Sequence, residues 1–485
     1  MEINKKNFYS ATYTFAVIII FQVIGNYSRQ KYVQEEFMDD AIHYVKLAYQ
    51  IADKGIYSSD GIEYSYSREP LSSFLQAGYL KIFTPSSIHS DLNKLLTGRE
   101  NLLRVNAINL IYLLAISLAM WWVGWMIFHS HFWSMLAIAI TDMYLAFYEN
   151  YLITINSEML SILLLILLTG SLIKFTQFKN LKWAIWTGVI MGLLVLTKAV
   201  FYYLLPFYLL GVLILIWIRE VQSRKKLLTN FLAIGLSYFL IIFPWMFRNH
   251  IHFDDFSIAE RGGQVLLIRA IKNQMTEIEY KGGYYAYAPQ AFNKLFLGKI
   301  LDFKENDLIY GGKLQRLNRG LEEDQNAIQN NELDKLISYY QRTHFIEIPK
   351  LFKEASRLNV LPEELLKSKA FEMIKSDFTN HLKMTILFNW RGIWIYKGQY
   401  FFVALANLFL FVSFYFVFSK SLIKRDMVAL TLCLLTMYYI LFHSFLTHYI
   451  PRYSVILLPI LSLASVLLIR NCYNAFKKNN QFHPC

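Results

Sequence analysis

The stretch EEFMDDAIHY, residues 35–44, places four carboxylates in six positions soon after the first strongly apolar run of the chain. A carboxylate within hydrogen-bond reach of a hydroxyl can act as a general base, so Asp39 and Asp40 are the first candidates for proton transfer. The alternative is a solvated turn in which Asp39 caps the following helix. Glu35 and Glu36 fit that alternative better than a catalytic role.

Further acids lie in or beside apolar segments, where a charge at a helix centre costs about 2.5–3.5 kcal/mol. Asp142 and Glu149 are seven residues apart and would share one helix face. Glu158 follows in the stretch NYLITINSEML. Positioning of an acceptor or a metal is one interpretation of these acids, and a polar helix turn capped by Asn156 and Ser157 is the other.

Three cations also occur near the ends of apolar segments: Lys198 in VLTKAVFYYLLP, Arg248 in FPWMFRNHIHF and Arg452 in HYIPRYSVILLP. An arginine fork or a lysine ammonium suits phosphate oxygens, although lysine snorkelling and interfacial anchoring explain such positions as well. His250, His252 and His448 are weak metal candidates. The sequence contains no HExxH motif, phosphate-binding loop or dinucleotide fingerprint, so we expect the energy source to lie in the substrate.

Composition indicates a membrane protein. The 485 residues are 55% hydrophobic and 17% charged, whereas soluble domains carry about 25% charged residues. About ten runs are apolar enough to be read as membrane spans. They cover residues 8–27, 104–127, 132–148, 152–173, 183–198, 200–218, 229–247, 398–418, 427–446 and 453–470. The first has no small-residue cleavage site, so we interpret it as an uncleaved helix.

Basic residues predict that both termini lie inside. The predicted inside segments hold most of the Lys and Arg residues of the short loops and termini, which also explains much of the net charge of +13. Residues 28–103 and 249–397 then lie outside. We therefore predict a core over 1–248, an extracytoplasmic insertion over 249–397 and C-terminal spans with a cytoplasmic tail over 398–485. The cysteines Cys433, Cys472 and Cys485 fall outside the predicted external segments, so no disulfide framework is expected.

The predicted external segments have helical patterns of their own. Residues 39–53 place apolar side chains at helical spacing, which predicts a short amphipathic helix at the membrane surface. Residues 70–83 predict a second interfacial helix, and 320–380 look largely helical. The fold class is thus an all-α polytopic membrane protein.

The ordered landmarks resemble those of the GT-C membrane glycosyltransferases, the superfamily of protein O-mannosyltransferases and the aminoarabinose transferase. FMDDAIHY resembles the acidic pair after the first span, and REPL (68–71) stands where relatives have a basic-x-Pro turn. YLITINSEML, GLLVLTKAVFYYLLP, FPWMFRNHIHFDDF with RGG at 261–263, and HYIPRYSVILLP continue the match over most of 1–270 and 440–470. The acidic pair is Asp-Asp where the family often has Asp-Glu, and 271–397 matches no known pattern.

The resemblance implies a role for each candidate. Asp39 would be the catalytic base, with Asp40 supporting it. The implied donor-phosphate ligands are Arg68, Lys198, Arg248 and Arg452. The implied acceptor or metal ligands are Asp142, Glu149, Glu158 and His448, with a divalent metal as the one cofactor left open.

The implied reaction moves a hexose or pentose from a polyprenyl phosphate to an acceptor hydroxyl on the extracytoplasmic side, with inversion. The implied setting is the bacterial inner membrane, with a lipid-linked donor and no nucleic-acid partner. The acceptor stays open between protein, lipid A, a teichoic-type polymer and a growing glycan. The alternatives are an O-antigen ligase or polymerase and a lipid flippase or transporter. A transporter is disfavoured because the charges gather at one boundary and no internal repeat is evident.

Overall fold

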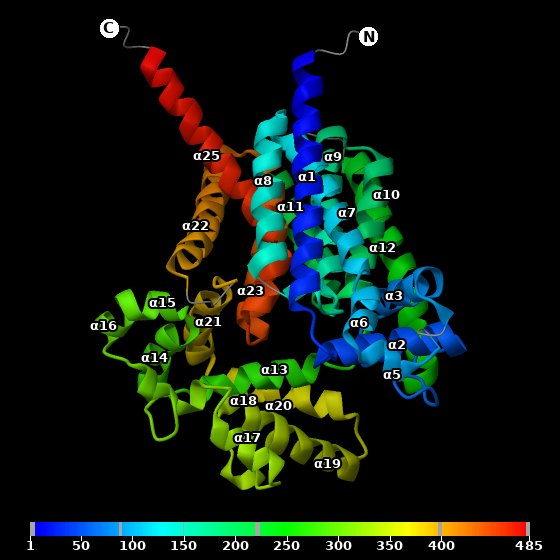
Figure 1. Ribbon diagram of the computed structural model, residues 1–485, viewed down its shortest axis with the longest axis vertical. Coiled ribbons are helices and arrows are strands. Elements are labelled where there is room, and N and C mark those ends of the chain that lie inside the picture. The colour runs from blue at the N-terminus through cyan, green and yellow to red at the C-terminus, as the bar shows by residue number, and fades with distance from the viewer. Residues whose placement is uncertain (1–4, 87–89, 149, 219–223, 396–399, 482–485) are drawn as a thin grey trace. The chain divides into compact units, whose positions relative to one another are not determined.

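The computed structural model describes residues 5–86, 90–148, 150–218, 224–395 and 400–481. Helices dominate, and within these ranges the only extended pairing is an isolated antiparallel bridge between Glu36 and Thr97. The chain divides into two compact units (Figure 1). Unit 1 comprises Met1–Ala259, Leu410–Tyr438 and Val455–Cys485, and unit 2 comprises Glu260–Phe409 and Tyr439–Ser454. The predicted all-α class is confirmed.

Unit 1 is a helical bundle with a long connection between its first two long helices. Its helices are α1 (Lys5–Tyr32), α2 (Asp40–Lys54), α3 (Pro70–Phe83), α5 (Leu92–Leu96), α6 (Arg99–Val105), α7 (Ile108–Phe128), α8 (His131–Met143), α9 (Glu158–Phe178), α10 (Leu181–Thr197), α11 (Leu204–Ile218), α12 (Arg224–Phe253) and α25 (Leu458–Gln481). Figure 1 shows α1, α7, α8 and α9 running side by side, and these helices pack on one another.

Seven helices in the described part of the chain are long and apolar enough to cross a membrane. They are Ala11–Tyr32, Arg99–Phe128, Glu158–Phe178, Leu228–Phe253, Phe401–Lys424, Met427–Leu446 and Pro451–Lys477. Three shorter apolar helices cover His131–Phe147, Leu181–Thr197 and Ala199–Gly211. Each of the ten predicted runs overlaps one of these helices. That all ten cross the membrane stays a prediction.

Small residues bring α10 and α12 close together. A Cβ atom on Gly188 would lie 2.1 Å from Ser237 Oγ and 2.3 Å from the carbonyl oxygen of Ile234. A Cβ atom on Gly192, one turn further along α10, would lie 2.7 Å from Ile241 Cβ. This is a small-xxx-small contact of the kind that lets membrane helices approach closely. It fixes α10 on α12, and the end of α10 leads into the candidate site.

The α1–α7 connection, residues 33–107, folds as a compact layer. Its core joins α2, α3, α5 and α6 through buried side chains that include Val45, Ala48, Leu80 and Leu95. The predicted apolar face of α2 therefore packs on protein. Helix α3 has the predicted bounds and leaves a set of large apolar side chains exposed, namely Phe74, Leu75, Ile82 and Phe83.

Unit 2 is also helical. Its main helices are α13 (Gly262–Ile271), α14 (Glu277–Tyr287), α15 (Gln290–Phe292), α16 (Gly298–Leu301), α17 (Glu322–Gln329), α18 (Tyr339–Arg342), α19 (Ile348–Leu358), α20 (Pro362–Ser376), α21 (Phe378–Gly392) and α24 (Pro451–Ser454). Helices α22 (Phe401–Lys424) and α23 (Met427–Leu446) contribute residues to both units. The helical character predicted for 320–380 is confirmed.

The unit boundaries differ from the predicted insertion, 249–397. Unit 2 begins at Glu260 and takes in Tyr439–Ser454 as well. Hydrogen bonds explain the addition, because buried Arg269 donates to the carbonyl of Ser444 at 3.3 Å and Arg391 donates to that of His448 at 3.1 Å. Such pairings between distant segments leave no local pattern in the sequence.

Candidate active site

Asp39 occupies the N-cap position of α2 in an unusual backbone conformation, with φ 52° and ψ −128°. This region is normally left to glycine, and a side chain there carries strain of about 1–3 kcal/mol. The side chain makes no capping hydrogen bond and is exposed. The capping alternative therefore does not describe what this carboxylate does.

Asp40, the next residue, forms an ion pair with Arg68. The Arg68 side chain is 11% exposed and the Asp40 side chain is 30% exposed. The guanidinium also lies 5.4 Å from the ring centroid of Tyr44, one turn along α2. Asp40 therefore orients Arg68, and the acidic pair has one exposed member and one member engaged with a cation.

Glu69 connects this region to the end of α10. Its Oε1 accepts a hydrogen bond of 2.7 Å from the backbone N–H of Ala199. The Tyr57 hydroxyl donates to the carbonyl of Arg68 at 3.0 Å, which holds the turn from the other side. Sequence reasoning did not single out Glu69 as a site residue. The sequence feature that could have identified Glu69 is the acid directly before the proline in REPL.

Glu158 and Lys198 form the second ion pair, with 3.3 Å between Oε1 and Nζ. Glu158 is the first residue of α9 and its side chain is 1% exposed, while Lys198 directly follows α10 and is 14% exposed. Asn106 and Asn109 fix the approach to α9. Their side-chain amides donate to the carbonyls of Ile153 at 3.0 Å and Thr154 at 2.8 Å.

Together these contacts define a row of alternating charge, which we call the charged row: Asp40, Arg68, Glu69, Lys198 and Glu158. Tyr44 packs into it. Burial, followed by the charge of Glu69, raises the pKa of the Tyr44 hydroxyl, so this group remains a neutral donor at ordinary pH. Arg68 and Lys198, each paired with a carboxylate, can stabilise a developing anion, and the exposed Asp39, which precedes Asp40 in the chain, can accept a proton.

Arg248 binds the α1–α7 connection. It donates to the carbonyls of Ser65 at 2.7 Å and Tyr57 at 3.3 Å. The guanidinium also lies 4.8 Å from the ring centroid of Trp245 and 5.2 Å from that of Tyr64. Through these contacts Arg248 anchors the α1–α7 connection to α12.

Asp142 lies apart from the charged row. It is fully buried in the bundle, where Ser117 Oγ donates to its Oδ2 at 2.7 Å, and its Oδ1 has no hydrogen-bond partner among the described residues. Ser117 is eight residues along α7 from Asn109, or about 12 Å at 1.5 Å per residue. Glu149 lies outside the described residues.

His448 and Arg452 belong to unit 2. His448 is 8% exposed, and Arg452 lies half-buried in α24. Over the described ranges, no group of three or more His, Cys, Asp or Glu side chains is arranged to hold a metal ion. Asp40 and Glu158 each face a cation. The described residues therefore do not fit a divalent metal.

The comparisons with known proteins concern the fold. No protein-family model and no curated protein matches the sequence. The solved structure of the archaeal oligosaccharyltransferase AglB from Archaeoglobus fulgidus, in complex with an inhibitory peptide and a dolichol-phosphate, superposes with a TM-score of 0.52 and 12% identity. The match covers 98% of this chain and 52% of that one. The same enzyme with Zn and sulfate gives 0.51 and 13%, covering 95% and 49%.

ArnT from Cupriavidus metallidurans, bound to undecaprenyl phosphate, gives a TM-score of 0.40 at 11% identity, covering 93% of this chain and 78% of that one. The chain spans about half the length of the oligosaccharyltransferase structures that it matches. The oligosaccharyltransferase matches extend over nearly all of this chain, so they concern helices of both units. The chain therefore has a GT-C-like fold, which it shares with the matched half of the oligosaccharyltransferase.

Proposed function

We propose that this protein is a membrane glycosyltransferase that moves a sugar from a polyprenyl-phosphate donor to an acceptor hydroxyl. The observation that carries the proposal is the charged row, in which carboxylates pair with Arg68 and Lys198 and whose first member, Asp40, directly follows the exposed Asp39. The GT-C fold supports it, and the AglB neighbour was solved with a dolichol-phosphate. We also propose that the α1–α7 connection lies on the extracytoplasmic face, in the bacterial inner membrane.

In this mechanism Asp39 is the general base. It takes the proton of the acceptor hydroxyl while the hydroxyl oxygen attacks C1 of the sugar. The bond between C1 and the phosphate oxygen breaks on the opposite side, so the configuration at C1 inverts. The products are the glycosylated acceptor and a polyprenyl phosphate anion.

The two held cations stabilise that anion. Arg68 and Lys198 are each fixed by a carboxylate, so they need no rearrangement when negative charge develops on the leaving phosphate. The leaving group is already a stable anion, and a strong general acid is therefore unnecessary. Arg248 supports the site indirectly, because it holds residues 57–65 in place.

The direct test is a transfer assay with purified protein in detergent or nanodiscs and a panel of polyprenyl-phosphate sugars. Asp39→Asn should fold normally and lose transfer, because the amide is not a base. Unchanged turnover of that variant would eliminate Asp39 as the base. A matched control is Asp53→Asn, which changes an exposed acid at the far end of the same helix.

The same preparation separates the alternative functions. A flippase would move labelled lipid across a liposome bilayer without forming a glycosidic product. A ligase or polymerase would transfer a preassembled glycan from a lipid carrier and leave single lipid-phosphate sugars unused. Product formation from a single-sugar donor favours the proposed reaction over both.

A further inference from the structure

Unit 2 contains a group of basic side chains that lie near a buried carboxylate and a buried histidine. Its members, which we call the cationic cluster, are Lys272, Arg316, Arg319 and Arg391, with His448 beside them. The carboxylate is that of Glu279 in α14, which is 3% exposed. None of the four cations was predicted as a site residue, because residues 271–397 carry no recognisable motif.

Tyr339 joins the first two cations. The ammonium of Lys272 lies 4.5 Å from the centroid of its ring, and the guanidinium of Arg316 lies 4.1 Å from the same centroid. The Tyr339 hydroxyl donates to Glu279 Oε2 at 2.9 Å. Arg316 also lies 3.6 Å from Glu279 Oε1. One ring and one carboxylate therefore hold two cations together.

His448 joins the other two cations. Arg391 donates to its carbonyl at 3.1 Å, and Arg319 lies 4.0 Å from the centroid of Tyr340, whose ring is 6.5 Å from that of His448. His448 is only 8% exposed. Its Nδ1 has no hydrogen-bond partner in the described part of the chain. A buried ring nitrogen is therefore left for a ligand beside the cations.

The charge of the cluster is unbalanced. Glu279 interacts with Lys272 and Arg316, so the four cations and this one carboxylate together carry a formal excess of three positive charges. Burial, followed by the charge of Arg391, lowers the pKa of Lys272 well below its usual value. Like charges held together in a buried position are unfavourable unless an anion compensates them.

The cluster also has a route to solvent. Lys272 is only 5% exposed, whereas the Arg316 side chain is 42% exposed and Arg319 is exposed. A ligand can therefore meet the two outer arginines first and Lys272 afterwards.

We propose that the cationic cluster is a binding site for a multivalent oxyanion of the phosphate type, a phosphomonoester or a pyrophosphate. Guanidinium forks and a lysine ammonium are the donors that suit such oxygens. The formal excess of charge matches a group with two or three negative charges. The site stands independently of the proposed glycosyl transfer, since it shares no residue with the charged row.

The test is calorimetric titration of the full-length protein in detergent with inorganic pyrophosphate at constant ionic strength. Lys272→Met keeps most of the apolar stem, removes the buried charge and should weaken binding about tenfold or more. Arg319→Gln changes an exposed residue, so it should fold normally, and it should weaken binding several-fold.

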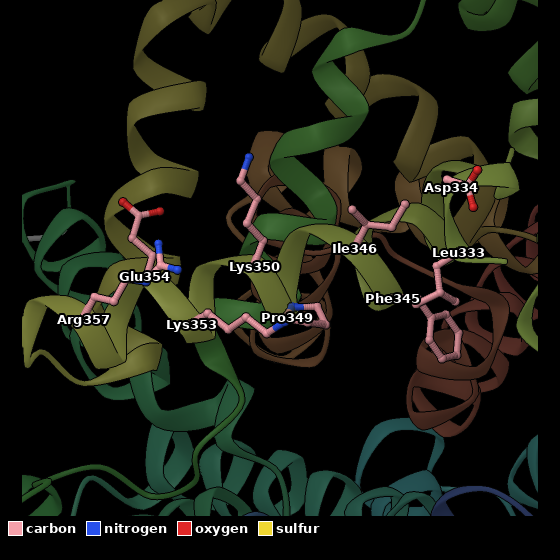
Figure 2. Close-up of a pocket in the computed structure, with 9 residues that line it drawn as sticks. All are labelled: Leu333, Asp334, Phe345, Ile346, Pro349, Lys350, Lys353, Glu354 and Arg357. Atoms are coloured by element: carbon pink, nitrogen blue, oxygen red, sulfur yellow. The ribbon is translucent and has the colours of Figure 1, made fainter. Parts of the chain in front are cut away.

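Basic residues of unit 2 that lie outside the cationic cluster provide control variants for this titration. A pocket of about 520 Å³ lies beside α19. Its lining includes Lys350, Lys353 and Arg357 (Figure 2). Arg357→Gln should leave pyrophosphate binding unchanged. Equal losses in Arg319→Gln and Arg357→Gln would indicate unspecific screening and overturn the proposal, as would an absence of binding to the wild type. Binding that is lost in Arg68→Gln and kept in Lys272→Met would also overturn it.

Competition identifies the source of the anion. Farnesyl phosphate and farnesol serve as probes, because they differ only in the phosphate. Displacement of pyrophosphate by farnesyl phosphate at much lower concentration than by inorganic phosphate would support a lipid-borne phosphate. Similar potency of the two phosphates would support a water-soluble phosphorylated ligand. Equal competition by farnesol would show an apolar site and contradict the proposal.

Discussion

The carboxylate of Glu158 lies 3.3 Å from the ammonium of Lys198, and the two side chains are only 1% and 14% exposed. The pair joins the start of α9 to the end of α10. A buried ion pair contributes little net stability compared with an apolar pair, but removal of one partner leaves a charge without compensation. This asymmetry makes the pair testable by a double-mutant cycle.

Glu158→Gln and Lys198→Met should each destabilise the protein, by about 3–5 kcal/mol on the scale of broken buried pairs. The double variant should recover a large part of that loss, because neither charge then remains unpaired. Thermal unfolding in detergent measures all three variants. Additive losses would mean that the two side chains act independently, contrary to the geometry.

Asp39→Gly separates the chemistry of Asp39 from its backbone conformation. Glycine adopts φ 52° and ψ −128° without strain, so the variant should be more stable than the wild type by about 1 kcal/mol. It should nevertheless be inactive, because the proposed base is gone. Asp39→Ala is the matched comparison, since it also removes the carboxylate but keeps a Cβ atom. A destabilised glycine variant would argue that the carboxylate itself holds the turn.

Glu69 should protect one backbone amide. Its Oε1 accepts from Ala199 N–H at 2.7 Å, and Glu69→Ala removes that acceptor while Glu69→Gln keeps an oxygen in a similar position. For the alanine variant only, we expect faster hydrogen exchange in peptides that contain Ala199. A shift of Lys198, the residue before Ala199, would in addition lower the transfer rate of that variant. Equal protection in all three proteins would mean that the contact is not formed in solution.

The contrast between α3 and Glu69 shows what the sequence can reveal. Helix α3 has the predicted bounds, and the spacing of α2 was also readable, because apolar side chains recur with each helical turn. Glu69 and Ala199 are 130 residues apart, and their contact leaves no periodic trace. A resemblance at the level of motifs ranked Asp39 first, but it did not reveal that Asp40 and Arg68 form a pair.

Unit 2 shows the same limit more strongly. Lys272, Arg319 and Arg391 come from three distant segments, and each looks like an ordinary surface cation in the sequence. His448 was predicted as an acceptor or metal ligand because histidine can ligate metal and because it lies among the charged residues placed toward the outer face. The packed unit surrounds it with cations, an environment that a metal cation would avoid.

The membrane orientation is testable with a native cysteine. Cys472 is exposed near the end of α25, whereas Cys433 is buried. In a Cys485→Ser background, a membrane-impermeant maleimide should label Cys472 in inverted vesicles and leave it unlabelled in intact spheroplasts. A cysteine introduced by Asp53→Cys in the α1–α7 connection should show the opposite pattern. Labelling of both positions from one side would contradict the proposed placement.

The histidines of unit 2 predict that acid destabilises it. Burial, followed by the charges of Arg391 and Lys272 and then Arg319, lowers the pKa of His448 to about 3. Burial and Arg269 lower that of His381 to about 4. An unfolded histidine has a pKa of about 6.5, so below that pH the unfolded chain binds protons that the folded chain excludes.

The stabilising contribution of His448 is therefore complete above about pH 6.5 and is lost as the pH falls towards 3, at up to about 1.4 kcal/mol per pH unit. Between pH 7 and pH 5 the unfolding temperature should drop less in His448→Gln than in the wild type. The remaining drop should shrink again when His381→Gln is added. An unchanged slope in His448→Gln would mean that this ring is accessible to protons in the folded protein, and the buried cationic surroundings described for it would then be wrong.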